Sequence, residues 1–245
     1  GNPTDKNTSD NTLTVTGTAE PGSTVKIYDN GVLVGTGTAD ASGNYSITTS
    51  VLADGQHPLT VTATDTAGNV SPATNLGTWT IDTSAPVAPT VVSVGDDTGK
   101  SATDKITSDK TLTVTGTAEP GSTVKVYDNG VLVGTGTADA NGNYSVTTSA
   151  LADGNHPLTI TATDTAGNQS LSTNLGTWTI DTSAPNAPGV VSVSQDTGNP
   201  TDKNTSDNTL TVTGTAEPGS TVKIYDNGVL VGTGTADANG NYSIT

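Results

Sequence analysis

Thr111–Thr137 reads TLTVTGTAEPGSTVKVYDNGVLVGTGT, and this stretch decides the fold. Its first eight residues place an apolar residue or glycine at every second position, with threonine between them. That is the period of a half-buried β-strand. Thr123–Asp128 alternates in the same way and is followed by Asn129-Gly130, a pair that favours a type I′ turn. Val131–Thr137 is therefore predicted to return beside Thr123–Asp128 as the second strand of a β-hairpin.

Four other short segments around this hairpin are predicted strands, and none has the period of a helix. They are Val91–Val94, Asn143–Thr148, Pro157–Thr163 and Thr177–Ile180. Seven short antiparallel strands joined by turns rich in Asp, Asn, Gly and Pro are typical of an immunoglobulin-like β-sandwich. The chain has no cysteine pair, and Trp178 comes near the last strand. We therefore expect an all-β, immunoglobulin-like fold that is not of the antibody type.

The same sequence recurs along the chain with a period close to the size of a small domain. TLTVTGTAEPGSTVK begins at Thr12, at Thr111 and at Thr209, and GTWTIDTSAP occupies both Gly77–Pro86 and Gly176–Pro185. Solenoid repeats are shorter, at roughly 20–50 residues. The sequence therefore predicts a tandem array of copies of one domain, which suits a part that sets length and spacing.

Three repeats are predicted. The first repeat (residues 1–85) lacks its first strand, the second repeat (residues 86–184) is complete, and the third repeat (residues 185–245) lacks its last strands. The chain begins and ends inside a repeat, so we expect it to be part of a longer array. A partial sandwich exposes unpaired strand edges, so we expect the third repeat to need further sequence or another chain for stability.

The composition excludes several classes of function. The 245 residues include no cysteine, which excludes disulfides and thiolate metal sites. The net charge of −16 makes nucleic acid and anionic membranes unfavourable partners, because both are polyanions. No apolar run is long enough to cross a membrane, so we expect no membrane insertion.

The sequence also offers no catalytic arrangement. No carboxylate lies in an apolar setting that would raise its pKa for acid catalysis. His57 and His156 each precede a proline at the start of a strand, with no nucleophile nearby, so both are predicted to be structural or solvated. We therefore expect no enzymatic activity.

Three motifs in a fixed order carry a resemblance to a known family. They are GTAEPGSTVKVYDNG, DANGNYSVTTSALADGNHPLTITATDTAGN and WTIDTSAP. Together they resemble the bacterial immunoglobulin-like (BIg) repeats of giant secreted surface adhesins, and the match covers every copy. The resemblance implies a secreted protein of the bacterial cell surface whose domains act as extenders for an adhesive tip. The adhesive ligand would then lie outside these residues. The resemblance also implies calcium at the domain junctions.

Strand direction predicts that one set of carboxylates meets at each junction between repeats. The first set is Asp82, Glu119, Asp139 and Asp164, and the second is Asp181, Glu217 and Asp237. Calcium takes six to eight oxygen ligands, which such a junction can offer, whereas zinc prefers nitrogen and sulfur. With a short linker at Ser84–Ala88, we expect Ca²⁺ to lock neighbouring repeats of the chain into an extended rod.

A second candidate calcium site is the loop GDDTGKSATDKITSD, which holds four acids. These are Asp96, Asp97, Asp104 and Asp109. The lysines of the same region, Lys100, Lys105 and Lys110, could neutralise them without a metal. Turn chemistry is the alternative for every acid named so far, because Asp in a turn accepts hydrogen bonds from its own backbone.

Two other functions remain open at the level of sequence. Each repeat could be a binding module for carbohydrate or protein that gains strength through multivalency. Its candidate contacts are Tyr28, Tyr127 and Tyr225, which are predicted to point outward, one in each copy. Alternatively, repeats of different chains could pair sideways and form a filament.

Overall fold

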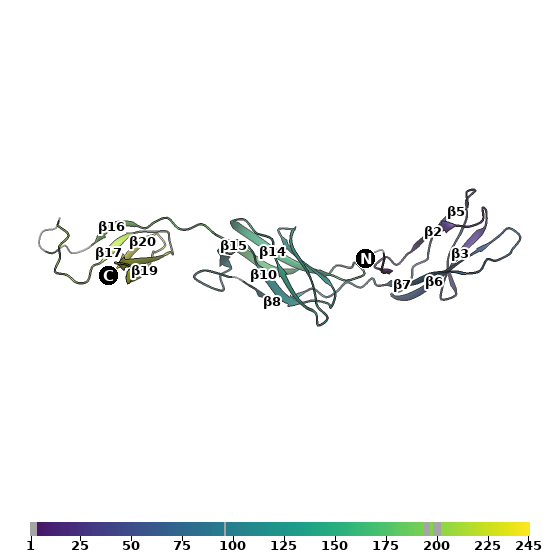
Figure 1. Cartoon of the computed structure of the whole chain (residues 1–245), viewed down its shortest axis with the longest axis horizontal. Coiled ribbons are helices and arrows are strands. Elements are labelled where there is room, and N and C mark those ends of the chain that lie inside the picture. Colours follow the sequence, from purple (N-terminus) through teal and green to yellow (C-terminus); the bar gives the residue numbers. More distant parts are fainter. Residues whose placement is uncertain (1–3, 96, 194–196, 198–201) are drawn as a thin grey trace. The chain divides into compact units, whose positions relative to one another are not determined.

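The computed structural model describes residues 4–95, 97–193, 197 and 202–245, which form β-strands joined by turns and contain no helix. Strands β1–β7 belong to the first repeat, β8–β15 to the second and β16–β20 to the third (Figure 1). The chain divides into two compact units, Gly1–Thr182 and Ser183–Thr245. The first two repeats therefore share one unit, and the third repeat forms the other. The predicted repeat boundaries themselves stay predictions.

The second repeat is a sandwich of two sheets. One sheet has the strand order β12-β11-β14-β15-β9 and the other has the order β13-β10-β8. The strands are Thr90–Val94 (β8), Ile106–Thr107 (β9), Thr113–Thr117 (β10), Thr123–Asp128 (β11), Val131–Thr137 (β12), Asn143–Thr147 (β13), Gly154–Thr163 (β14) and Thr173–Ile180 (β15).

The first repeat has the same plan with one strand fewer. Its sheets have the orders β1-β7-β6-β3-β4 and β2-β5. The strands are Asn7–Thr8 (β1), Thr14–Thr18 (β2), Thr24–Asp29 (β3), Val32–Thr38 (β4), Asn44–Thr48 (β5), Gly55–Thr64 (β6) and Thr74–Ile81 (β7). No described residue before β2 forms a counterpart of β8, so one edge of β2 is free of a strand partner.

The third repeat has a three-stranded sheet of order β16-β17-β20 and the hairpin β18-β19. The strands are Gly189–Val193 (β16), Val212–Thr215 (β17), Thr221–Asp226 (β18), Val229–Thr235 (β19) and Asn241–Ile244 (β20). The described residues hold no counterpart of β14 or β15. The buried core of this repeat is accordingly small, and it consists of Val222, Tyr242 and Ile244.

The alternation read from the sequence matches the burial of the strands. In β11, Val124 and Val126 are fully buried, while Lys125 between them is half-buried. The β11–β12 hairpin closes through Asn129 and Gly130, whose φ angles are 45° and 83°. Two successive positive φ angles are what a type I′ turn requires, and this turn matches the right-handed twist of the flanking strands. The expectation of an all-β, immunoglobulin-like sandwich is confirmed.

One feature of the topology differs from the prediction of antiparallel strands only. The loop after β8 contains the short strand β9, which pairs in parallel with the end of β15 through Ile106–Thr179 and Thr107–Ile180. Lys105, the residue before this strand, has a φ angle of 62°, and its ammonium donates to the carbonyl of Leu175 over 3.2 Å. A strand of two residues is too short to be recognised from alternation in the sequence. In the first repeat, β1 pairs in parallel with β7 in the same way.

Candidate functional site

The junction between the first and second repeats is held by the side chain of Asn168. Its Nδ2 atom donates to the backbone carbonyl of Asp82 over 2.7 Å and to Oδ2 of Asp164 over 2.8 Å. Asp82 follows β7 of the first repeat, and Asp164 follows β14 of the second. The amide nitrogen therefore lies between two oxygen atoms contributed by different repeats.

Asp164 is held in place by its own turn. Its Oδ1 atom accepts hydrogen bonds from the backbone N–H groups of Gly167 and Asn168, over 2.7 and 2.8 Å. The side chain is one of the few acidic groups that the fold buries, with 8% of the residue exposed. A buried carboxylate is stable only where it is hydrogen-bonded or paired with a positive charge, and the turn together with Asn168 meets that need.

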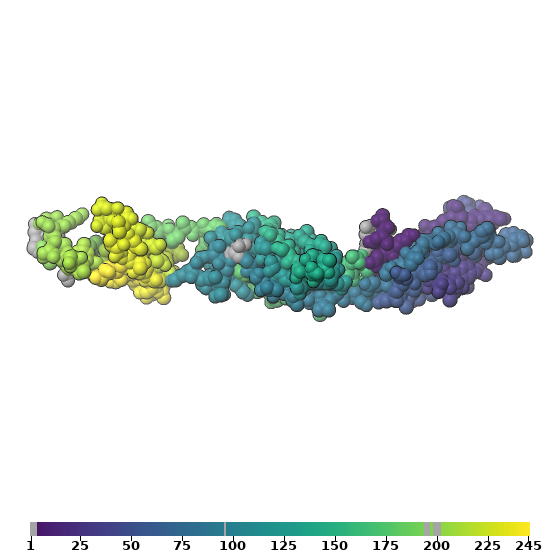
Figure 2. All heavy atoms as spheres, turned by 60° about the horizontal axis from the view of Figure 1, so that its bottom comes forward, coloured from purple at the N-terminus to yellow at the C-terminus, as the bar shows by residue number. Residues whose placement is uncertain are grey.

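Two further hydrogen bonds join the same repeats on the other side of this turn. The Nδ2 atom of Asn7 donates to Oγ1 of Thr165 over 2.8 Å, and the backbone N–H of Ser9 donates to the carbonyl of Ala166 over 3.0 Å. The purple N-terminal segment correspondingly meets a green segment of the second repeat in Figure 2. Ala166 is fully buried as a result. The junction is thus a hydrogen-bonded contact between two sandwiches and more than a flexible link.

The other predicted ligands of the first junction have separate roles. Asp139 accepts hydrogen bonds from the backbone of Asn141 and Asn143 over 2.8 Å each. The bond from Asn143 is the largest of the influences that lower the pKa of Asp139. Glu119 is exposed. Across the described part of the chain, no group of three or more His, Asp and Glu side chains lies close enough together to hold a metal ion. Calcium at the junction therefore stays a prediction.

The predicted ligands of the second junction lie in different units. Asp181, in the first unit, is exposed, and its backbone N–H donates to the carbonyl of Thr107. In the second unit, Glu217 is exposed and Asp237 repeats the turn of Asp139, with Asn239 and Asn241 as donors over 2.8 Å. Calcium at this junction also stays a prediction.

The acidic loop of the second repeat is organised by turn hydrogen bonds. Asp97, Asp104 and Asp109 accept from the backbone N–H groups of Lys105, Ile106 and Thr111 over 3.0, 3.1 and 2.8 Å. Asp96 lies outside the described residues. The second oxygen of Asp97, Oδ1, is buried and has no hydrogen-bond partner. One carboxylate oxygen of each of these three acids thus accepts a hydrogen bond from the backbone, as the turn alternative predicts.

A buried histidine–aspartate pair lies at the opposite end of each of the first two repeats. In the second repeat, Nδ1 of His156 lies 2.7 Å from Oδ2 of Asp128, and Nε2 lies 2.8 Å from the carbonyl oxygen of Ala152. His57 makes the same contacts with Asp29 and Ala53 in the first repeat. Both partners of each ring are hydrogen-bond acceptors, so the arrangement suits the doubly protonated imidazolium.

The pKa of His156 follows from two opposing influences. Burial lowers the pKa most, but the hydrogen bonds to Asp128 and Ala152 and the negative charge of Asp128 together raise it by more, so that it lies above its ordinary value. The sequence analysis predicted a structural or solvated histidine, but it did not identify the aspartate partner. The signal was available, because Asp and His recur at the same spacing of 28 residues in both repeats.

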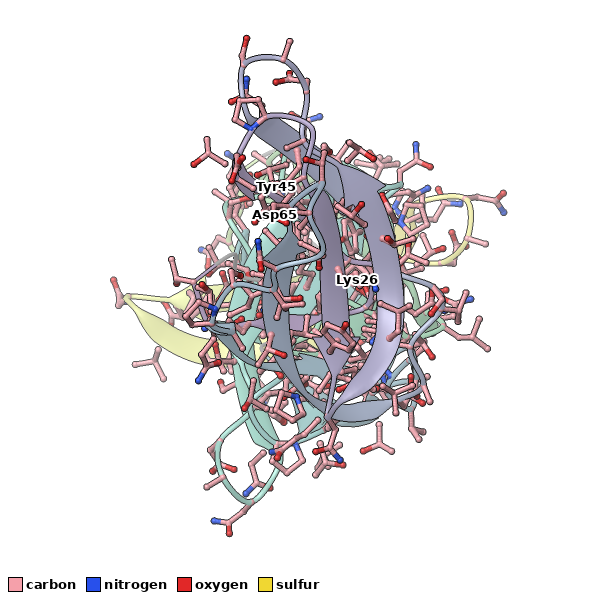
Figure 3. The ribbon with its side chains drawn as sticks, turned by 90° about the vertical axis from the view of Figure 1, so that its right-hand side faces the viewer. Lys26, Tyr45 and Asp65 are labelled. Carbon is pink, nitrogen blue, oxygen red and sulfur yellow. The ribbon has the colours of Figure 1, made fainter. Side chains whose placement is uncertain are left out.

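The predicted outward tyrosines do not form an aromatic platform. Tyr28 and Tyr127 are half-buried, and only Tyr225 is exposed to more than half of its area, at 56%. Figure 3 shows Lys26 on β3, apart from Tyr45 and Asp65. No observation at these positions favours a carbohydrate site.

Within the described residues, no helix is long and apolar enough to cross a membrane.

Paired sheets of this strand order, repeated along one chain, define a tandem immunoglobulin-like β-sandwich protein. Sequence models of two related families match the chain: a bacterial Ig domain over residues 1–78 and 184–245, and a bacterial Ig-like domain over residues 85–182. The chain belongs to the bacterial Ig-like domain proteins. Domains of this class are typically structural modules without enzymatic activity.

Solved structures with a related arrangement share little sequence with the chain. Fibronectin(III)-like modules of CbhA from Clostridium thermocellum are 17% identical, with 69% of this chain and 85% of that chain covered and a TM-score of 0.48. The BSP domain of a biofilm-associated protein is 25% identical, with coverages of 72% and 29% and a TM-score of 0.29. The D00-D0 domain of intimin is 15% identical, with coverages of 70% and 96% and a TM-score of 0.25.

All three TM-scores are below 0.5, so the family assignment rests on the sequence models alone. No curated protein matches the chain.

Proposed function

We propose that this chain is a spacer from a secreted bacterial cell-surface adhesin, which sets the distance between the cell and an adhesive domain elsewhere in the protein. The observation that carries the proposal is the hydrogen-bonded junction of Asn168 with Asp82 and Asp164. A spacer must transmit position from one domain to the next. A junction with direct contacts between sandwiches does this better than a free linker.

The surface of the chain supports the same function. The net charge is −16, and the exposed strand faces are rich in threonine. A strongly charged surface keeps a protein soluble and opposes association with other polyanions. Near-identical repeats add length without adding a new activity, which is what a spacer requires.

We further propose that calcium stiffens the junction at Asp164. The carboxylate of Asp164 and the carbonyl of Asp82 face a common point, which the amide nitrogen of Asn168 occupies. Rotation of that amide by half a turn would present its oxygen instead, giving three oxygen donors of the kind that Ca²⁺ binds. Water would supply the remaining ligands. In the acidic loop, the unpartnered Oδ1 of Asp97 is a further oxygen donor of the same kind.

The full chain tests the calcium proposal by thermal unfolding and small-angle X-ray scattering, each with calcium and with excess chelator. We expect calcium to raise the unfolding midpoint and to lengthen the particle. Asp164→Asn should remove most of both effects, because it removes the charge of the ligand but keeps an acceptor for the turn.

Asp65→Asn is the matched control. Asp65 makes the same turn contacts with Asn69, over 2.8 Å, but it is half-buried and no described residue of another repeat caps it. The calcium proposal is wrong if neither quantity responds to calcium, or if both variants weaken the response equally. The spacer proposal itself is wrong if the particle is as short as freely jointed domains in both conditions.

A further inference from the structure

The chain that leaves β7 for the second repeat is held to the first repeat by the carboxylate of Asp54. Its Oδ1 atom accepts hydrogen bonds from the backbone N–H and the hydroxyl of Thr83, over 3.1 and 2.8 Å. Its Oδ2 atom accepts from the hydroxyl of Ser84 over 3.2 Å. These two residues directly follow Asp82, whose carbonyl oxygen accepts the junction hydrogen bond from Asn168. Asp54 therefore positions the segment through which the two repeats meet.

The loop that carries Asp54 is itself held by the buried ring of His57. The Nε2 atom of this ring lies 2.8 Å from the carbonyl oxygen of Ala53, and Nδ1 lies 2.7 Å from Oδ2 of Asp29 on β3. Gly55, which follows Asp54, has a φ angle of 137° and open space around its Cα atom. Since glycine is free to change its backbone angles, the loop can pivot at this residue when the contact with His57 is lost.

The second repeat contains the same connection between its histidine and the chain that leaves it. His156 contacts the carbonyl oxygen just two residues before Gly154 over 2.8 Å, and the next residue, Asp153, accepts from the hydroxyl of Thr182 over 2.9 and 3.0 Å. One difference is that Nζ of Lys110 lies 3.6 Å from Asp153. The first repeat has asparagine at the matching position, so its linker contact depends on the carboxylate alone.

The protonation state of the His57 ring decides whether both of its contacts are hydrogen bonds. The imidazolium donates from both nitrogens, and both partners are acceptors, whereas the neutral ring has only one N–H group. That proton stays on the side of Asp29, because a hydrogen bond to an ionised acceptor is about twice as strong as one to a neutral acceptor. The lone pair of Nε2 then faces the lone pairs of the Ala53 carbonyl oxygen, and the two atoms repel each other.

Few other charged groups surround this ring. Asp29 is the charged group in contact with it, and Lys26 and Tyr28 on the same strand point to the opposite face of the sheet, because side chains alternate along a strand. Strands β1, β2, β4 and β7 hold no titratable side chain, and β5 holds one tyrosine. In the loops at this end, Asp10 and Asp82 accept hydrogen bonds from backbone N–H groups of their own turns.

The remaining acid of the loop, Asp54, stays ionised where His57 titrates. The hydrogen bond from the hydroxyl of Thr83 is the largest of the influences that lower the pKa of Asp54. The pKa of His57 lies above its ordinary value: burial lowers it most, but the hydrogen bonds to Asp29 and Ala53 and the charge of Asp29 outweigh burial. Above about pH 6.5 the ring is therefore the group of this loop that changes its charge.

We propose that His57 makes the junction between the first two repeats sensitive to pH. The doubly protonated ring holds Ala53, so that Asp54 keeps Thr83 and Ser84 in place. Loss of the proton displaces the loop, weakens the contact with the linker and loosens the junction. The junction is therefore stiff below the pKa of the folded histidine and looser above it. This inference rests on the proposed spacer function, because it concerns how firmly one repeat positions the next.

The test follows the full chain by nuclear magnetic resonance as the pH rises, in excess chelator so that calcium plays no part. The chain has only two histidines, so each ring titration can be measured separately. We expect the backbone amide proton signal of Thr83 to move with the same midpoint as the ring of His57. Asp54→Ala removes the acceptor and gives the signal position of a released linker. Asp54 is exposed, so this variant keeps the core intact.

The two histidines provide a matched pair of variants. His57→Gln removes the titrating ring from the first repeat and should abolish the movement of the Thr83 signal with pH. His156→Gln makes the same change in the second repeat and should leave that movement as it is. The ring titration and the Asp54→Ala reference do not need either variant, so the proposal stays open to test even if a glutamine variant fails to fold.

A Thr83 signal that does not follow the ring of His57 overturns the proposal, and so does a movement that survives His57→Gln. Small-angle scattering of the same samples measures the consequence for the junction, and we expect a longer particle below the pKa of His57 than above it. A length that is the same at every pH also overturns the proposal. The spacer function is separate, because it fails only if the particle is as short as freely jointed domains throughout.

Discussion

Trp178 of the second repeat is 4% exposed, whereas Trp79, at the matching position of the first repeat, is half-buried. Ala166 is fully buried, whereas Ala67 is exposed. The sequences around these pairs are nearly the same, so the difference comes from what covers them. In the second repeat β8 completes the sandwich, and the first repeat caps the turn at Ala166. The burial of the second repeat's core therefore depends in part on its first strand and on the contact with the first repeat.

Truncation of the two tryptophans tests this difference most strongly. Trp178→Ala should lower the free energy of unfolding by about 3–5 kcal/mol, because it removes a large side chain from a well-packed core. Trp79→Ala should cost clearly less, since its site is already partly hydrated. Chemical unfolding followed by circular dichroism measures both variants. Equal losses would show that the two cores are packed equally well.

Gly116, which faces β8, and Gly17 at the matching position of the first repeat should give a smaller contrast. A Cβ atom added at Gly116 would collide with the backbone carbonyl oxygen of Thr90, which cannot move without displacing β8. Gly116→Ala should therefore cost about 1–3 kcal/mol.

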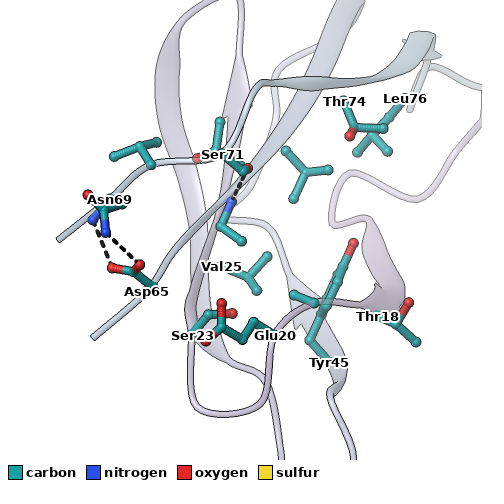
Figure 4. A pocket seen from close by; sticks show the side chains of 15 residues that line it. Thr18, Glu20, Ser23, Val25, Tyr45, Asp65, Asn69, Ser71, Thr74 and Leu76 are labelled. Atoms are coloured by element: carbon teal, nitrogen blue, oxygen red, sulfur yellow. Dashed lines mark hydrogen bonds between the residues drawn. The ribbon is translucent and has the colours of Figure 1, made fainter. Parts of the chain in front are cut away.

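Gly17→Ala is the counterpart in the first repeat and should cost less. The added Cβ atom meets only the ring of Tyr45, 2.6 Å from its hydroxyl oxygen, and this ring can turn into the groove that it lines in the first repeat (Figure 4). The same unfolding measurement applies. A larger loss for Gly17→Ala than for Gly116→Ala would contradict the role assigned to β8.

The histidine pairs should show the smallest difference, because both repeats contain them in the same form. The pKa of His57 and of His156 is raised in the folded state: burial lowers it most, but the hydrogen bonds and the charge of the partner aspartate together outweigh burial. Each pair therefore contributes stability that is fully present below the unfolded pKa of about 6.5 and is lost as the pH rises through the folded pKa.

Unfolding midpoints measured from acidic to alkaline pH test this expectation. Stability should fall as the pH rises through this range, and Asp128→Asn and Asp29→Asn should each flatten part of the dependence. A dependence that survives both substitutions would assign the effect to other groups.

The strand pattern was open to prediction because it is a local property of the sequence. Alternation at Thr123–Asp128 and the Asn129-Gly130 turn each depend on residues that are neighbours along the chain. Strand β9 could not be found in this way, because two residues carry no period. Its pairing with β15 depends on a contact across more than 70 residues.

The candidate site was only partly open to prediction, for a related reason. Strand direction placed Asp82 and Asp164 at one junction, and the structure brings the two together through Asn168. Their roles were not predictable, because Asp82 contributes its backbone carbonyl, which carries no sequence signal. An acid such as Asp139, bonded within its own turn, has the same sequence signature as an acid that binds a metal.

The short parallel strand pair in each of the first two repeats also has a mechanical consequence. The backbone N–H groups of Thr179 and Asp181 donate to the carbonyl oxygens of Lys105 and Thr107 over 2.8 and 2.9 Å. Hydrogen bonds therefore join β15 to the chain at both ends of β9. When two parallel strands are pulled in opposite directions along their length, the hydrogen bonds between them bear the force at the same time. They do not break one after another. These hydrogen bonds would thus resist tension applied to the ends of the repeat. In the first repeat, two backbone hydrogen bonds of 2.8 and 3.0 Å hold β1 on β7 in the same way.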